Sequence, residues 1–175
     1  MRDQQNKIQT LSKILARIIA GLLFLLPLLS FVIWLRIDWF ADFFRNQYDV
    51  ASFDIRTQAY GLVFSMIPLS IWMYGLYNLR HLFTNYAAGR VFVPDNAKYI
   101  KRFAWMSIFG GGLAPVFGGV YSLILSMNHA AGERFLAIGL GTTEIHTILL
   151  GLVFVVIAHV MEAAHKLSEE NRQFI

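Results

Sequence analysis

The stretch IIAGLLFLLPLLSFVIWL, residues 18–35, decides the fold. It contains no charged residue, and it is close to the roughly 20 residues that a helix needs to cross the hydrocarbon core of a bilayer. In that core every backbone N–H and C=O must be paired within the segment, which favours an α-helix. The stretch is longer than the apolar part of a usual signal peptide, and Trp34, Leu35 and Arg36 offer no small-residue cleavage pattern. We expect a retained transmembrane helix.

Three further stretches qualify as spans. Residues 61–79 and 104–125 contain no charged residue, and residues 145–160 are interrupted only by His146 and His159. The whole chain is 57% hydrophobic and only 15% charged, whereas soluble domains have about 25% charged residues. No linker, repeat or second domain is visible. The sequence therefore predicts an all-α polytopic membrane protein, with four transmembrane helices forming a single domain over residues 1–175.

The distribution of basic residues predicts the orientation. Lys and Arg accumulate in the cytoplasmic segments of membrane proteins. Most of the 15 Lys and Arg residues lie before the first span, between the second and third spans, and after the fourth. The two other connections hold only Arg36, Arg45, Arg56 and Arg134. We expect both termini and the central loop to be cytoplasmic in a multi-pass protein of the bacterial inner (cytoplasmic) membrane.

The first outer connection contains an amphipathic pattern. On a helical wheel one side carries charge and the other carries aromatic rings. The charged residues are Asp38, Asp42 and Arg45, and the aromatic ones are Trp39, Phe40, Phe43 and Phe44. This pattern favours an interfacial helix lying on the outer leaflet; a lid or a docking surface for another protein is the alternative.

The central loop and the tail contain most of the remaining polar residues. The second helix is expected to continue to Gly89, which suits a helix stop. Pro94 and Asp95 predict a turn, with Asp95 or Asn96 capping the helix that enters the third span. Residues 161–173 combine helix formers with mixed charge, so they predict an extension of the fourth helix.

Small residues recur every four positions along the third span, at Gly110, Ala114, Gly118, Ser122 and Ser126. Such a stripe lets another helix approach closely and gain dispersion contacts. The partner is a helix of the same chain, a second protomer in a homo-oligomer, or another protein. The spacing does not decide among them.

Proline lies near the middle of three spans, at Pro27, Pro68 and Pro115, and each removes a backbone donor and favours a kink. Broken helices at this depth form substrate sites in transporters. A small transporter or channel component is therefore one alternative function, although no acidic or basic residue lies at the depth of these prolines.

His159, Glu162 and His165 are spaced three apart in the fourth helix, with His81 as a further candidate ligand. This is not the spacing that places two histidines one helical turn apart for zinc. A structural or proton-responsive role is favoured, and a metal-linked membrane sensor is a second alternative. Glu144 and His146 are expected at the outer membrane boundary, partly hydrated.

We predict no catalytic, cofactor-binding or metal-binding residue. The chain has no cysteine, and we found no nucleophile elbow, no paired intramembrane carboxylates and no phosphate-binding glycine loop. It also lacks a basic soluble module that could bind nucleic acid directly. The sequence therefore disfavours an enzyme.

Two stretches resemble a known family. The first comprises Leu79-Arg80-His81-Leu82-Phe83, Tyr86, Gly89, Val91-Phe92, Asn96-Ala97, Ile100 and Arg102-Phe103-Ala104-Trp105; the second is Leu167-Ser168-Glu169-Glu170-Asn171. They resemble a bacterial four-helix membrane family catalogued as domain of unknown function twenty-nine seventy-five. The family tends to end in an acidic residue, Leu, Thr and an aliphatic residue, whereas this chain ends in Gln173, Phe174 and Ile175. The resemblance implies four spans with cytoplasmic ends, carries over no catalytic residue, and suggests a regulatory membrane partner because members are thought to sit beside small helix-turn-helix regulators.

The concentration of polar residues on one side predicts the function. We expect a non-enzymatic interaction or regulatory module that acts through the loop from Arg80 to Phe103 and the tail from Met161 to Ile175, with the lipid bilayer and a protein as partners.

Overall fold

Four long helices make up the computed structural model, which describes residues 2–44, 48, 50–130 and 132–173. They are α1 (Arg2–Leu35), α3 (Ile55–Ala87), α4 (Pro94–Ser126) and α5 (Thr142–Gln173). Three short helical turns lie between α1 and α3, namely η1 (Ile37–Phe40), α2 (Ala41–Phe44) and η2 (Val50–Ser52). All four long helices are long and apolar enough to cross a membrane. The prediction of an all-α protein with four helices able to cross a membrane is confirmed.

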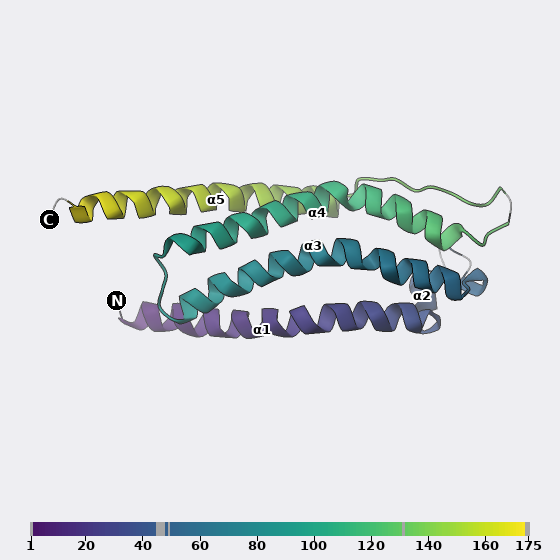
Figure 1. Cartoon of the computed structure of the whole chain (residues 1–175), viewed down its shortest axis with the longest axis horizontal. Helices are drawn as coiled ribbons and strands as arrows, with labels where there is room; N and C mark the ends of the chain where they lie inside the picture. The colour runs from purple at the N-terminus through teal and green to yellow at the C-terminus, as the bar shows by residue number, and fades with distance from the viewer. Residues whose placement is uncertain (1, 45–47, 49, 131, 174–175) are drawn as a thin grey trace.

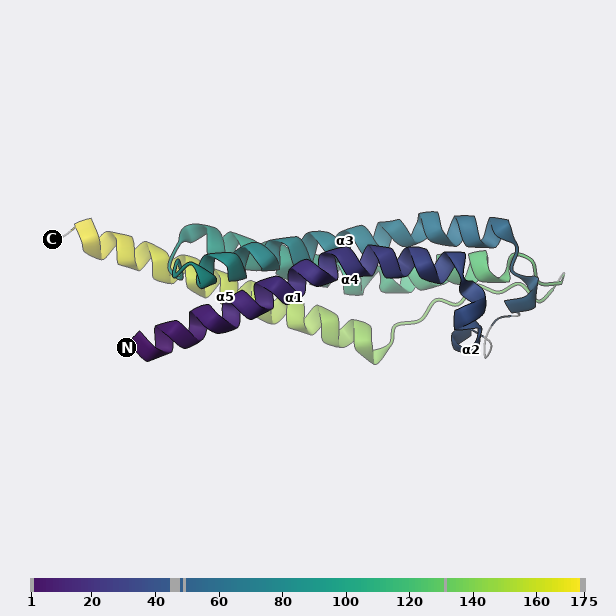
Figure 2. The same cartoon turned by 90° about the horizontal axis from the view of Figure 1, so that it is seen from below.

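The long helices form a row in which α1 packs on α3, α3 on α4, and α4 on α5. Figure 1 shows this order, with the start of α1 and the end of α5 at the same end of the row as the α3–α4 loop. We call this end the terminal end and the opposite one the distal end. In the turned view α5 crosses α4 obliquely, and its first turns lie away from the distal ends of α1 and α3 (Figure 2).

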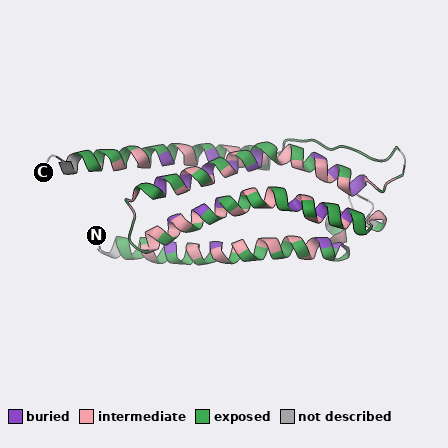
Figure 3. Ribbon diagram, in the orientation of Figure 1, coloured by how far each residue is buried: buried purple, intermediate pink, exposed green. Residues whose placement is uncertain are grey.

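The surface of the row is apolar. Figure 3 shows buried residues as small patches between neighbouring helices, with exposed residues along most of the outer surface. Phe24, Val63 and Val156 are 75%, 69% and 63% exposed, respectively. Large apolar side chains exposed along whole helices would aggregate in water, whereas a bilayer accommodates them at no cost.

The packed core is divided between the two ends. Trp34, Ile37 and Leu125 form a buried cluster near the distal end. Leu82, Ile100 and Ala158 form another near the terminal end. The helices therefore contact each other through two short cores, with lipid expected to cover the remaining faces.

Close helix approaches depend on glycine. A Cβ atom at Gly61 would overlap the ring of Trp34, so this glycine lets α1 and α3 approach. A Cβ at Gly151 would lie 2.7 Å from Ile108 Cγ1 and 2.9 Å from the Ala104 carbonyl oxygen. Gly151 therefore fixes the crossing of α5 over α4.

The small-residue stripe of α4 contacts other parts of the same chain. A Cβ at Gly110 would lie 3.4 Å from the Trp72 ring of α3. Further along, the stripe meets extended backbone rather than a helix: the Ala137 N–H donates to Ser122 Oγ (2.8 Å), and Ser126 Oγ lies 3.4 Å from the Phe135 nitrogen. We name residues 133–141 the extended segment; it runs along the distal half of α4.

The helix α5 begins beside the middle of α4. The Glu144 carbonyl oxygen would lie 3.1 Å from a Cβ at Gly111, near the middle of the third predicted span. The reason is the extended segment, which covers the length of α4 that a longer α5 would have covered. From Thr142 to Leu167, α5 is nevertheless long and apolar enough to cross a membrane, and the place of Glu144 at the outer membrane boundary stays a prediction.

The ends of α3 and the start of α4 follow local chemistry. Asp54 caps α3 by accepting the Thr57 N–H (2.8 Å), and this hydrogen bond holds the pKa of the Asp54 carboxyl below its ordinary value. After α3, Gly89 adopts φ +76° as expected for a helix stop. The predicted turn at Pro94 and Asp95 is wrong: Val93 is the N-cap and Pro94 is the first residue of α4, a position where its missing N–H costs nothing.

The predicted interfacial helix corresponds to the short elements η1 and α2, which follow each other directly. Ile37 is buried, whereas Trp39 is 65% exposed with the Arg36 guanidinium 4.2 Å from its ring centroid. Arg45 lies outside the described residues, and the side chains of Phe43 and Phe44 are not described. The prediction that this stretch is helical is thus confirmed for residues 37–44, and its place on the outer leaflet stays a prediction.

We expect Gly151→Ala to destabilise the protein by about 1–3 kcal/mol, the usual cost of overpacking a close contact. The new methyl group would displace Ile108 or the Ala104 backbone. Thermal unfolding in detergent micelles measures this effect. Gly112→Ala is the matched control, because a Cβ at Gly112 meets nothing within 4 Å. Unchanged thermal stability in the Gly151→Ala variant would contradict the close contact of α5 with α4 at Gly151.

Candidate functional site

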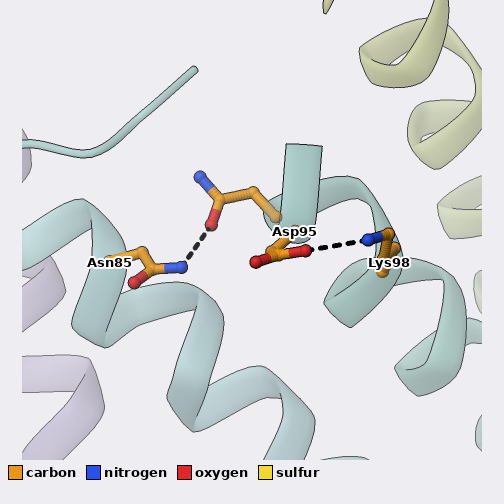
Figure 4. Close-up of polar contacts among 4 residues, drawn as sticks. Asn85, Asp95 and Lys98 are labelled. Carbon is orange, nitrogen blue, oxygen red and sulfur yellow. Dashed lines mark hydrogen bonds and ion pairs between the residues drawn. The ribbon is translucent and has the colours of Figure 1, made fainter. Parts of the chain in front are cut away.

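The loop between α3 and α4 is held by hydrogen bonds of two side-chain amides, those of Asn85 and Asn96. Asn96, in the first turn of α4, is fully buried, and its Nδ2 donates to the carbonyl oxygens of Arg90 (2.8 Å) and Val91 (2.9 Å). Its Oδ1 accepts a hydrogen bond from Asn85 Nδ2 (2.8 Å), near the end of α3. Arg90 Nη2 in turn donates to Asn85 Oδ1 (2.7 Å). Figure 4 shows Asn85 extending towards the start of α4.

The backbone of the loop is paired as well. The Gly89 N–H donates to the Tyr86 carbonyl (3.0 Å), and the Arg90 N–H donates to the Asn85 carbonyl (2.9 Å). This pattern, with a positive φ at glycine, is a Schellman-type helix end. Residues 88–93 are therefore held in one conformation from both flanking helices.

The fixed loop presents Phe92 to the surroundings. Its side chain is 88% exposed, although Val91 and Val93 on either side are half-buried. Because the amide network fixes the backbone at Arg90 and Val91, the loop loses little backbone entropy when Phe92 contacts another molecule.

The loop and the tail helix meet at this end. A cavity of about 110 Å³ lies between them, lined by Val91, Phe92, Val93, Pro94, Ala97, Met161, Ala164 and His165. Lys101 Nζ of α4 lies 3.6 Å from Glu162 Oε1 of α5. The sequence singled out loop and tail separately, and the structure brings them together into one surface. We call this surface, residues 88–98 with 161–166, the loop–tail surface.

Exposed charges surround Phe92. Arg90 and Lys98 are exposed, and Lys98 Nζ pairs with Asp95 Oδ1 at 2.9 Å (Figure 4). Both side chains of this pair are more than half exposed, so solvent screens the interaction and the pair contributes little to stability.

The histidine-containing triplet has separate partners. His159 Nδ1 lies 2.8 Å from the Val155 carbonyl, Glu162 pairs with Lys101, and His165 Nε2 lies 3.4 Å from Glu169 Oε1. His81 stacks on Tyr99 with ring centroids 5.3 Å apart. Within the described ranges, no group of three or more His, Asp or Glu side chains is placed to hold a metal ion.

The prolines and the remaining polar candidates lie elsewhere. Pro27, Pro68 and Pro115 are inside continuous helices, and Pro68 lines a cavity near the distal end. Glu144 is half-buried beside α4, and His146 is exposed. None of these residues belongs to the loop–tail surface.

The roles of Asn85 and Asn96 were not predicted. Asn96 was expected as a helix cap, but its side chain binds the loop carbonyls instead. The position of Asn96 was the available signal. This amide directly follows Pro94 and Asp95, and a second amide, Asn85, and the helix-stop residue Gly89 lie only one short loop before it.

We expect Asn96→Ala to loosen the loop, because it leaves the Arg90 and Val91 carbonyls and the Asn85 amide without their partner. Losing buried partners costs about 1–3 kcal/mol. Hydrogen exchange of the amides of residues 88–93 should accelerate by at least about fivefold. Asp95→Ala is the control, since it removes only an exposed ion pair. Equal exchange in both variants would contradict the network.

Comparisons with known proteins identify a family. Neither curated proteins nor solved structures gave a significant match to the chain. A family model described as a protein of unknown function (DUF2975) matches residues 24–175. The matched range contains α3, α4, α5 and the whole loop–tail surface, and it confirms the resemblance seen in the sequence. The chain belongs to the DUF2975 family.

Proposed function

We propose that this protein is a non-enzymatic module of the bacterial inner membrane that binds a cytoplasmic protein through the loop–tail surface. The observation that carries the proposal is Phe92, a side chain 88% exposed on a loop fixed by fully buried Asn96. A large apolar residue held outward on a rigid backbone is typical of an interaction hot spot.

Charge supports a partner with an acidic rim. The loop and the flanking helix ends contain Arg80, Arg90, Lys98, Lys101 and Arg102. Asp95 pairs with Lys98, and Glu162 of the tail pairs with Lys101, so the three arginines account for the excess of positive charge. Such an excess of positive charge attracts an acidic surface and accelerates association. A soluble protein with an apolar pocket for Phe92 and acidic residues around it fits both features, and a regulatory role follows from binding such a protein at the membrane.

The same basic residues support the cytoplasmic location of this surface. The start of α1, the α3–α4 loop and the end of α5 share one end (Figure 1), and this end carries most of the Lys and Arg residues. By the positive-inside tendency it lies in the cytoplasm.

Cysteine labelling tests the orientation directly, because the chain has no cysteine of its own. In intact cells we expect a membrane-impermeant thiol reagent to modify Asp38→Cys, at the distal end, and to leave Phe92→Cys unmodified until the membrane is permeabilised. Both positions are exposed, so accessibility on the protein does not limit the reaction. Labelling of Phe92→Cys in intact cells would reverse the topology.

Photocrosslinking tests the contact. With a photoreactive amino acid at position 92 in the full chain, we expect a protein adduct in native membranes. Phe92→Ser should weaken binding of the partner by about 30-fold, the loss of one hot-spot residue of about 2 kcal/mol. Trp39→Ser, which removes an exposed ring at the other end, should leave the binding unchanged. Adducts with lipid alone at position 92 would refute protein binding and make Phe92 a membrane anchor.

A small transporter is the second candidate, and the start of α5 favours it. Discontinuous helices that begin within the membrane point their positive dipole ends at substrates in transporters, and α5 begins beside the middle of α4. Flux assays in liposomes distinguish the candidates. Solute movement that is abolished by replacing Pro68 and Pro115 would favour transport, whereas a tight bilayer containing folded protein would exclude it.

A further inference from the structure

A cavity of about 570 Å³ opens between α1, α3 and α4, far from the loop–tail surface. Its lining residues fall within the first three predicted spans, apart from Tyr48 of the first connection. This volume is within the range of about 300–1,000 Å³ for small-molecule sites. The cavity therefore faces the hydrocarbon of the distal leaflet and is large enough for part of a lipid-sized molecule.

Most of the wall is apolar, including Leu26, Leu29, Ile33, Pro68 and Leu69. The described lining contains no charged side chain. Burying an anionic carboxylate or phosphate there would cost a large desolvation energy with no cation to offset it. The wall thus selects an uncharged ligand with a long apolar body.

One corner of the cavity is polar. Trp34 Nε1 and the Tyr121 hydroxyl both donate to Ser65 Oγ, at 2.6 Å and 2.9 Å, and the Ser65 hydroxyl donates to the Gly61 carbonyl at 2.6 Å. The first two of these hydrogen bonds join α1, α3 and α4, and the third lies within α3. We call Trp34, Ser65 and Tyr121 the polar triad.

The direction of these bonds determines what the corner can still bind. Each side-chain donor of the polar triad is already used, and the Ser65 oxygen accepts two hydrogen bonds. The Tyr121 oxygen keeps acceptor capacity, because no described residue donates to it. A ligand that binds to the Tyr121 oxygen must therefore supply a hydrogen-bond donor.

We propose that this cavity binds an uncharged membrane lipid with a long apolar chain and a hydroxyl group, whose O–H donates to the Tyr121 oxygen. The apolar chain lies along Leu26, Leu29 and Leu69, and the hydroxyl lies at the polar triad. This site is independent of the contact proposed for the loop–tail surface. A lipid alcohol, including the neutral glycerol or prenol types, has the required chemistry.

Labelling of the full-length protein in detergent tests the proposal. The probes are a photoreactive long-chain alcohol and a carboxylate of the same chain length at a pH where it is ionised. We expect the alcohol to label peptides that contain residues 26–34 and 65–72, with at least about fivefold higher affinity than the carboxylate.

Two variants address the two parts of the site. Tyr121→Phe removes the acceptor and should weaken alcohol binding by about fivefold, the effect of one hydrogen bond; Tyr74→Phe, on an exposed part of α3, should have no effect. Leu29→Trp fills the cavity without touching the polar triad and should abolish labelling. Because Leu29 is 43% exposed, this variant should fold even if Tyr121→Phe does not, and thermal unfolding checks both.

Three results would overturn the proposal. Equal affinity for alcohol and carboxylate would show that the cavity holds any acyl chain without recognising the hydroxyl. Labelling that persists in Leu29→Trp would place the ligand outside the cavity. Labelling spread equally over the lipid-facing residues, such as those around Phe24, would show that no site exists.

Discussion

Pairing of backbone hydrogen bonds in hydrocarbon is the constraint on which the rest of this structure depends. It explains why the uncharged stretches form unbroken helices and why short turns gather at the helix ends. It also explains the role of the buried serines. Ser122 and Ser126 are fully buried beneath the extended segment and contact its backbone, so they replace part of the pairing that a helix would have provided internally.

Much of the fold could be predicted because its signals are local. Charge-free stretches located the four spans, Gly89 marked the end of α3, and mixed charge predicted the extension of α5 to residue 173. The start of α4 was misplaced because proline can equally well make a turn or begin a helix. The register of α5 depends on where Gly151 meets Ala104 and Ile108, and such a contact between helices has no signature within either sequence stretch.

In the candidate site, too, local features could be predicted and contacts between distant residues could not. The sequence pointed to the loop and the tail through their polarity, but the buried role of Asn96 depends on carbonyls that the folded loop brings to it. The stripe on α4 was recognised as a packing face, yet its distal half receives extended backbone. Small residues predict that another part of the protein packs closely against them. They do not predict which part, because that depends on the length of the connection and on hydrogen bonds between residues far apart in the sequence.

The extended segment has a consequence for biogenesis. Helices can enter a bilayer one by one, because each pairs its own backbone. The extended residues 133–141 do not pair their own backbone. Their hydrogen bonds with the side chains of Ser122 and Ser126 form only when α4 is already in place. Each of the four long helices can therefore cross the bilayer by itself, whereas residues 133–141 reach their final position only after α4 is in place.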